Sequence, residues 1–238
     1  MTARALTFYG STIGKKVTMA ITGLIGFGFI VGHMTGHLIA FKGALPYNQY
    51  AYFLKHTPAL LWGTRFTLLA ALILHVHCMV SLWSLNNEAR PRAYHQRKDL
   101  ATNYAALTMR WGGLFLLFFL LYHLAHFTIG YAAVSEAITG GVPFDENNPY
   151  NNMILGFQNP IVAGLYILAM VALGMHLYHG IWSLTQTLGA AHPKYNGLRK
   201  QASILGTLVV VLGFLTVPVS VLTGVLEPVE PGTEEAQE

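Results

Sequence analysis

The sequence contains a single cysteine, Cys78, among 238 residues. One cysteine excludes an intramolecular disulfide, a C-x-x-C-H haem attachment and an iron-sulfur cluster made by this chain alone. Any metal that the chain binds must therefore use other ligands.

Charge is also scarce: 10% of the residues are charged and 53% are hydrophobic, against about 25% charged in an ordinary soluble domain. Five apolar segments reach the roughly 20 residues that a helix needs to cross the bilayer, and none carries Asp or Glu in its middle. We predict an all-α membrane protein in which residues 1–226 form one domain of five transmembrane helices. The predicted helices lie near 16–41, 60–85, 107–131, 161–188 and 202–226.

The few charges are distributed unevenly. With the N-terminus inside, the external side receives only Lys42, Lys55 and Arg65 of the 14 Lys and Arg residues. The positive-inside rule then predicts a cytoplasmic N-terminus and an external C-terminus. The acidic tail 227–238 has no Lys or Arg and is polar and proline-rich, which predicts a disordered external end.

The connections between the helices are short. Those on the cytoplasmic side are too short for a soluble catalytic domain, so any cytoplasmic chemistry must belong to another subunit. The external stretch KGALPYNQYAYFLKHTPA predicts a short surface helix with interfacial aromatics at Tyr47, Tyr50, Tyr52 and Phe53. The other external stretch, SEAITGGVPFDENNPYNNMILGFQNP, is rich in Asn, Pro and Gly and predicts a lid of turns.

Small and aromatic residues mark two further features. Gly28, Gly32 and Gly36 recur every four residues on one face of the first helix, so a neighbouring helix or a flat cofactor can approach its backbone closely. The four tryptophans predict two interfacial belts that anchor the helices in the membrane. They are Trp62 at the external side and Trp83, Trp111 and Trp182 at the cytoplasmic side.

Eight of the 11 histidines lie in the apolar segments, as one pair on each of four consecutive helices. The pairs are His33 and His37, His75 and His77, His123 and His126, and His176 and His179. Polar groups at membrane depth are costly and rare, so four pairs indicate function rather than packing. Zinc prefers three or four clustered ligands, and proton relays normally use carboxylates, which these segments lack.

Depth along the helices groups the histidines into two levels. At about 1.5 Å per residue, His33 and His123 lie roughly 24 to 27 Å from the cytoplasmic ends, and His75 and His176 lie roughly 16 Å from them. Imidazole suits iron, and an iron porphyrin with two axial histidines needs one nitrogen from each of two facing helices at equal depth. The sequence therefore predicts two haems stacked across one bundle, an outer and an inner one.

Spacing does not decide which member of each pair binds iron. His75 and His77 point about 200° apart on a helix, so at most one of them faces the interior. One ligand per helix is the economical solution. The alternative set also matches in depth, and spacing leaves both sets open. Its members are His37, His77, His126 and His179.

The chain resembles the membrane cytochrome b subunit of succinate:quinone oxidoreductases, the succinate dehydrogenases and fumarate reductases of complex II, in the single-subunit, five-helix, two-haem branch. The resemblance rests on the order and spacing of several segments over nearly the whole chain. These segments are GKKVTMAITGLIGFGFIVGHMTGHLIAFKG, YNQYAYFLK, LHVHCMVSLWSLNNEARPRAY, TMRWGG, YHLAHFT, FQNP and HLYHGIWSLTQTLG.

The resemblance implies axial iron ligands at His33 and His123 for the outer haem b and at His75 and His176 for the inner one. It also implies a location in a prokaryotic cytoplasmic membrane and two cytoplasmic partners, a flavoprotein with covalent FAD and an iron-sulfur subunit. The electron carrier in the membrane would be menaquinone. The extra histidines depart from the family pattern, in which Asn often stands at the positions of His37 and His179.

The sequence leaves some roles open. Arg110, at the cytoplasmic end of the third helix, is a candidate contact for a haem propionate or an arginine that snorkels to the interface. Arg90 and Arg92 are expected at the partner surface or the lipid head groups. The alternatives for the whole chain are the cytochrome b anchor of a hydrogenase or formate dehydrogenase, and a haem-free membrane transporter.

Overall fold

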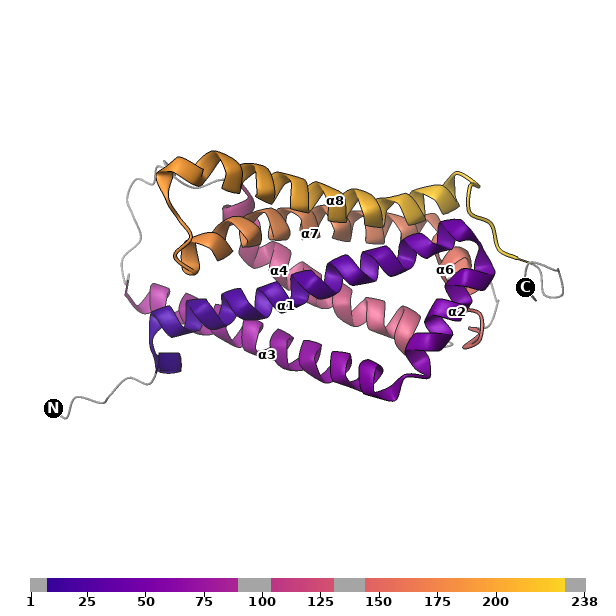
Figure 1. Cartoon of the computed structure of the whole chain (residues 1–238), viewed down its shortest axis with the longest axis horizontal. Coiled ribbons are helices and arrows are strands. Elements are labelled where there is room, and N and C mark those ends of the chain that lie inside the picture. The colour runs from indigo at the N-terminus through magenta and orange to yellow at the C-terminus, as the bar shows by residue number, and fades with distance from the viewer. Residues whose placement is uncertain (1–7, 90–103, 131–143, 230–238) are drawn as a thin grey trace.

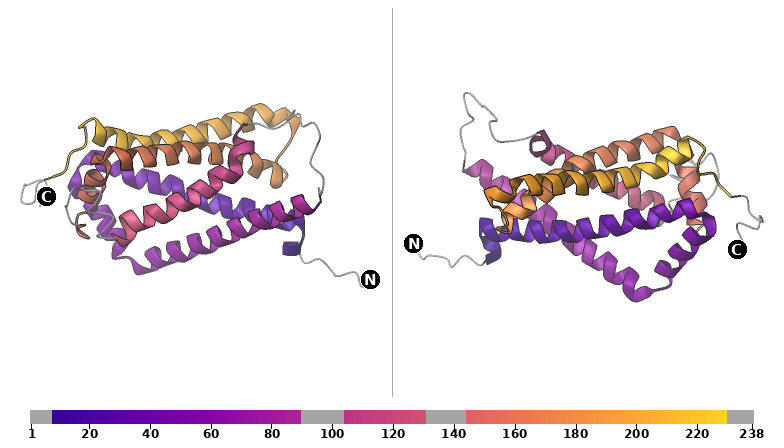
Figure 2. Two further views of the ribbon diagram at one scale, coloured as in Figure 1. Left: turned by 180° about the vertical axis from the view of Figure 1, so that it is seen from behind. Right: turned by 45° about the horizontal axis from the view of Figure 1, so that its top comes forward.

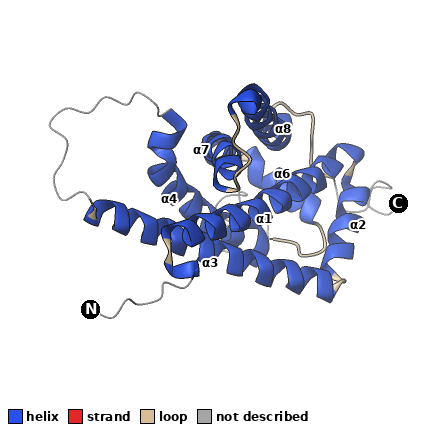
Figure 3. Cartoon of the chain, turned by 60° about the vertical axis from the view of Figure 1, so that its left-hand side comes forward, coloured by secondary structure: helices blue, strands red, loops and turns tan. Residues whose placement is uncertain are grey.

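The computed structural model describes residues 8–89, 104–130 and 144–229, and every secondary-structure element in these ranges is a helix (Figure 3). Five segments are long and apolar enough to cross a membrane, so the chain is a multi-pass membrane protein as expected. Which end faces the cytoplasm stays a prediction. The five spans are Thr12–Lys42, Pro58–Glu88, Tyr104–Ile129, Pro160–Thr187 and Pro193–Leu222.

The helices extend past the predicted segments at several ends, because polar residues continue a helix after the apolar run has stopped. The long helices are α1 (Thr12–Leu38), α3 (Pro58–Glu88), α4 (Tyr104–Leu124), α7 (Pro160–Thr187) and α8 (Asn196–Leu222). Shorter helices and turns connect or extend them: η1 (Phe8–Gly10), η2 (Ile39–Lys42), α2 (Ala44–Lys55), the π-helical turn η3 (Ala125–Ile129), α6 (Pro149–Gln158) and η4 (Pro193–Tyr195).

Helices α1 and α7 occupy the middle of the bundle. Helix α1 packs against α3, α7 and α8, and α7 packs against α4 and α8 (Figures 1 and 2). The start of α1 and the end of α8 lie at opposite ends of the bundle (Figure 1). Helices α3 and α4 bury few side chains and expose large apolar ones such as Phe66 and Phe118, as expected of helices that face lipid.

The segment predicted to be a lid of turns contains helix α6, so that prediction was wrong for residues 149–158. Asn148 caps the helix by accepting a hydrogen bond from the Asn151 amide at 3.1 Å, and Pro149 fills the first turn. The side chains of Tyr150, Met153, Ile154 and Phe157 follow a helical period and are buried. The Asn and Pro residues that suggested turns therefore mark the start of a buried helix.

Helix α2 is the short helix predicted for the external connection, but it is not purely interfacial. Tyr47 is only 7% exposed, and the ring of Tyr50 lies over Gly36 of α1, where a Cβ would come within 2.7 Å of Tyr50 Cε1. Tyr52 and Phe53, on the opposite face, are exposed. One side of α2 thus closes the end of the bundle.

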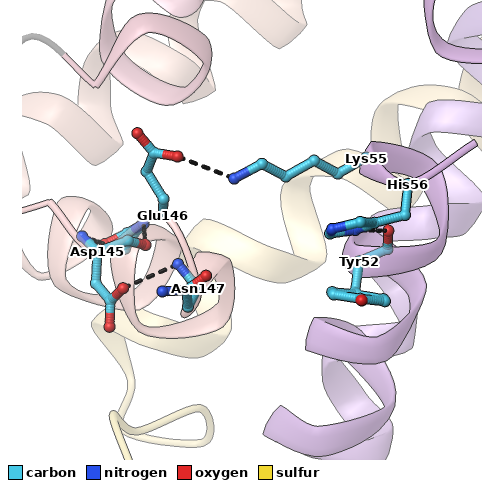
Figure 4. Close-up of polar contacts among 7 residues, drawn as sticks. Tyr52, Lys55, His56, Asp145, Glu146 and Asn147 are labelled. Atoms are coloured by element: carbon cyan, nitrogen blue, oxygen red, sulfur yellow. Dashed lines mark hydrogen bonds and ion pairs between the residues drawn. The ribbon is translucent and has the colours of Figure 1, made fainter. Parts of the chain in front are cut away.

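Polar contacts join α2 to the segment before α6 at this end. Lys55 Nζ lies 2.9 Å from Glu146 Oε2, and Asn48 Nδ2 donates to Asn148 Oδ1 at 3.2 Å (Figure 4 shows the ion pair). The hydrogen bond and the positive charge of Lys55 lower the pKa of the exposed Glu146 carboxyl. Helix α2 and residues 144–158 therefore form one cap over this end of the bundle.

The described residues after α8 contact α6. Leu226 is buried, and the Val229 amide donates to Asn151 Oδ1 at 2.9 Å while Asn151 Nδ2 donates to Val229 O at 2.7 Å. The prediction of a disordered tail was therefore wrong for residues 227–229, which are tied to α6. The rest of the tail lies outside the described residues, as do Arg90 and Arg92.

Candidate functional site

His75 of α3 and His176 of α7 face each other inside the bundle. Their ring centroids are 6.2 Å apart and the ring planes are inclined by 47°. The two helices come from distant parts of the chain, and the two histidines are those predicted to lie at the same depth in the membrane. We call this pair the inner pair, because it lies nearer the end of the bundle where α1 begins.

Helix α1 holds the ring of His75 through one nitrogen. His75 Nδ1 lies 3.1 Å from the backbone oxygen of Met19 and 3.1 Å from Thr22 Oγ1. The Thr22 hydroxyl donates to the Thr18 carbonyl at 2.9 Å, so both oxygens near the ring are acceptors and Nδ1 carries the hydrogen. The Nε2 atom of His75 is then the basic nitrogen. A metal-binding histidine typically has this arrangement, with one ring nitrogen bonded to a carbonyl and the other free to bind.

His176 contributes a buried nitrogen without a partner. Among the described residues, no group hydrogen-bonds to its buried Nδ1 atom. Glycines lie beside both rings of the inner pair: a Cβ at Gly23 would be 3.4 Å from His75 Cε1, and one at Gly113 would be 3.8 Å from His176 Cε1. A Cβ at either position would be in ordinary van der Waals contact with the ring, so both glycines line the space around the inner pair.

His33 of α1 and His123 of α4 form the outer pair. Their ring centroids are 5.8 Å apart and the rings meet edge to face, at 85°. The inner level lies beside Gly23 on α1 and beside Gly113 on α4, each ten residues before the outer histidine of the same helix. At about 1.5 Å per residue, the two levels are therefore roughly 15 Å apart along the bundle.

A chain of hydrogen bonds runs outward from His33. Its Nε2 atom lies 3.2 Å from Nε2 of His37, and Nδ1 of His37 lies 2.9 Å from the Tyr47 hydroxyl. Tyr47 also donates to Met153 Sδ at 3.4 Å, and burial raises its pKa. Binding of a metal through His33 Nε2 would replace the bond to His37, and His37 would keep its bond to α2.

The other members of the pairs have different surroundings. His77 is exposed on the outer face of α3, where its Nδ1 lies 2.6 Å from the Tyr9 hydroxyl of η1. His126 is only 2% exposed, and its Nδ1 lies 3.1 Å from the Tyr166 hydroxyl. His179 is half-buried on α7. The structure thus brings the four first members together as two pairs across the bundle.

The donors and spacing of the two pairs are compatible with a metal between each pair. An imidazole nitrogen lies about 2 Å from a bound metal and the ring centroid about 1 Å further, so two imidazoles on opposite sides of one metal have centroids about 6 Å apart. The inner pair matches this spacing, and the buried Nδ1 of His176 has no hydrogen-bond partner within the described ranges. Ligation itself stays a prediction.

The cations at the helix ends stack on tryptophans. The Arg110 guanidinium lies 4.8 Å from the centroid of the Trp83 ring and joins α4 to α3. Arg65 lies 5.1 Å from the Trp62 ring at the other end. Trp62, Trp83 and Trp111 are exposed, as expected for interfacial belts. The structure places Arg110 at the inner end without showing a contact to either histidine pair.

Two residues near the histidines, Thr22 and Tyr166, escaped the sequence reasoning, and a third, Tyr47, was assigned to the membrane interface. Each bonds to a histidine ring from a different helix. Their signal was depth, because Thr22 and Tyr166 are polar residues inside apolar runs at the inner and outer histidine levels. Matching all polar side chains by depth, rather than the histidines alone, would have found them.

Gly28, Gly32 and Gly36 do not share one neighbour. Tyr50 approaches Gly36, whereas no described atom lies within 4 Å of a Cβ built at Gly28 or Gly32. A protein side chain therefore approaches one glycine of the three, and the approach of a flat cofactor stays a prediction.

Comparisons of the chain with protein-family models, with curated proteins and with solved structures gave no match.

Proposed function

We propose that this chain is the dihaem cytochrome b subunit and membrane anchor of a succinate dehydrogenase or fumarate reductase. In this role it transfers electrons between an iron-sulfur subunit and menaquinone. The observation that carries the proposal is the presence of two histidine pairs, His75 with His176 and His33 with His123, facing each other across the bundle at two levels.

The residues of each level have distinct tasks in this proposal. His75 and His176 hold the inner haem b, and α1 fixes the His75 ring through Met19 and Thr22. His33 and His123 hold the outer one. A haem bound by two imidazoles supplies one-electron transfer.

The separation of the two levels has an energetic consequence. A full charge that crosses the membrane against a potential of 100 mV costs about 2.3 kcal/mol, and transfer between two levels about 15 Å apart covers part of that distance. Electron flow through this subunit is therefore coupled to the membrane potential.

The short connections between the described helices support the division of labour with partners, since none is long enough for a catalytic domain. A flavoprotein with FAD and an iron-sulfur protein would dock at the end where α1 begins. That end is the cytoplasmic one if the positive-inside prediction holds.

A pyridine haemochrome assay on the full chain, purified from membranes in mild detergent, tests the proposal. We expect two b-type haems per chain and co-purification of a flavoprotein that oxidises succinate. Haem with a formate- or hydrogen-oxidising partner would reassign the chain to another respiratory enzyme. Absence of haem from the purified chain would refute the proposal and favour a transporter.

A further inference from the structure

Tyr166 of α7 connects the two histidines at the end of α4. Its hydroxyl oxygen lies 3.3 Å from His123 Nδ1 and 3.1 Å from His126 Nδ1. The ring is almost fully buried among aromatic side chains from α4, η3 and α6. These neighbours are Phe119, Tyr122, Phe127 and Phe157.

The π-helical turn η3 makes this convergence possible. It begins directly after α4 and contains His126, so the helix is widened between the two histidines. His126 is fixed there on two sides. Its ring stacks on Phe127 with centroids 3.9 Å apart, and a Cβ at Gly156 of α6 would lie 3.0 Å from His126 Nε2.

The number of hydrogens on Tyr166, His123 and His126 limits how these three residues can bond to one another. A phenol has one hydrogen to donate, and a neutral imidazole carries hydrogen on only one nitrogen. Tyr166 can therefore donate to the Nδ1 of one histidine and accept from the Nδ1 of the other. Two arrangements of the hydrogens form both hydrogen bonds. They differ in which histidine has an Nε2 atom without a hydrogen.

We propose that Tyr166 and His126 are positioning residues that fix the tautomer of His123. In this arrangement His123 Nδ1–H donates to the Tyr166 oxygen, and the Tyr166 hydroxyl donates to His126 Nδ1. The Nε2 of His123 is then unprotonated and available to a metal. The inference rests on the proposed function, since it concerns the residues that hold the outer haem.

Geometry selects this arrangement over its reverse. His123 is the member whose ring meets His33 of α1, whereas His126 packs against α6. At the inner level His75 also directs Nδ1 to an oxygen, the carbonyl of Met19. A phenol that passes its own hydrogen to a further acceptor is a stronger acceptor, so the bond to His126 strengthens the bond to His123.

The phenol should also tune the outer haem. An acceptor on Nδ1 raises the basicity of a ligating imidazole and stabilises the oxidised metal. Removal of the Tyr166 hydroxyl is therefore expected to raise the reduction potential of the outer haem. The inner haem, held by His75 and His176, should not change.

The test compares variants of the full complex by haemochrome assay and by spectroelectrochemical titration of each haem. In Tyr166→Phe we expect both haems to be retained and the outer haem alone to shift to higher potential. His126→Leu, which removes the acceptor, should shift it in the same direction. His126→Gln keeps an acceptor oxygen and should restore the potential toward that of the unaltered protein. Tyr122→Phe removes a phenol from the same aromatic cluster and is the matched control.

The outcomes separate the two proposals. Unchanged potentials of both haems in Tyr166→Phe would overturn the positioning role while leaving the haem count intact. Another outcome would be loss of the outer haem in both His126 variants with normal potentials in Tyr166→Phe. That result would identify His126 as the iron ligand and would also overturn the positioning role. Loss of the outer haem in Tyr166→Phe would contradict the expected retention and overturn a role limited to fixing the tautomer of His123. The proposed function would instead be refuted by a haem-free unaltered protein, or by haem together with a formate- or hydrogen-oxidising partner.

Discussion

The rings of His75 and His176 lie with their centroids 6.2 Å apart, although the two residues are about a hundred positions apart in the sequence. On α3, two residues after His75, His77 faces out of the bundle and forms a hydrogen bond with Tyr9. Two histidines two residues apart are thus assigned to opposite faces of α3. This relationship gives the most direct test of the site.

Replacement of His75 by Ala should remove the inner haem and spare the outer one. His77→Ala should retain both, because its ring lies on the outer face and contacts η1. The measurement is haem content per chain with optical spectra of the remaining haem. A loss of haem in His77→Ala, with none in His75→Ala, would instead favour the alternative ligand set.

Gly36→Ala should destabilise the protein, because the new methyl group would lie 2.7 Å from the Tyr50 ring. Overpacking of this kind typically costs about 1 to 3 kcal/mol. Gly32→Ala, four residues earlier on the same helix, meets no described atom within 4 Å and is the control. Thermal unfolding in detergent should show a lower midpoint for Gly36→Ala only. Equal midpoints would mean that α2 does not pack on α1 as described.

Arg199→Ala should be more harmful than Lys200→Ala, although the two residues are adjacent. Arg199 is buried, donates to Thr185 Oγ1 and Asn196 Oδ1 at 2.8 Å, and lies over the Trp182 ring. Loss of hydrogen bonds from a buried charged group costs about 2 to 3 kcal/mol. Lys200 is exposed, and its replacement by Ala removes the same positive charge. Thermal unfolding in detergent should show a lower midpoint for Arg199→Ala than for Lys200→Ala. Similar unfolding midpoints for the two variants would contradict the structural role of Arg199.

Glu146→Gln should change stability only slightly and only in a defined pH range. Lys55 lowers the pKa of the Glu146 carboxyl in the folded protein. The ion pair therefore stabilises the fold fully above the pKa of the unfolded chain, about 4.3. This contribution is lost as the pH falls through the lower pKa of the folded protein. The effect is small and salt-sensitive, since the two side chains are 53% and 74% exposed. Unfolding midpoints at pH 7 and below pH 4, at low and high salt, test this. A difference that persists at low pH would point to another role for Glu146.

The orientation can be tested because the chain has a single, buried cysteine. Two single-cysteine variants are made in a Cys78→Ser background, Asn147→Cys and Lys194→Cys. Position 147 lies at the end capped by α2 and α6, and position 194 lies at the opposite end. Both positions are exposed. An impermeant maleimide added to intact cells should label the first and spare the second until the membrane is permeabilised. The reverse pattern would place the N-terminus outside.

Much of the fold could be read from hydropathy. The five spans follow from apolar length, and the two histidine levels follow from residue counting along helices of fixed rise. Helix α6 was missed because Asn148, Pro149 and Asn159 suggest turns. Those residues cap helices here, while the apolar period of Tyr150, Met153, Ile154 and Phe157 was the stronger signal.

The sequence by itself determined that five helices cross the membrane and that four of them carry histidine pairs at two depths. It also determined that His75 and His77 point in opposite directions, because the helical period sets their relative angle. Only the tertiary structure decided which of them faces inward, since the rotation of a helix about its own axis is set by its packing partners. The same packing placed Tyr166 between His123 and His126, a contact between helices that no period along one chain segment contains.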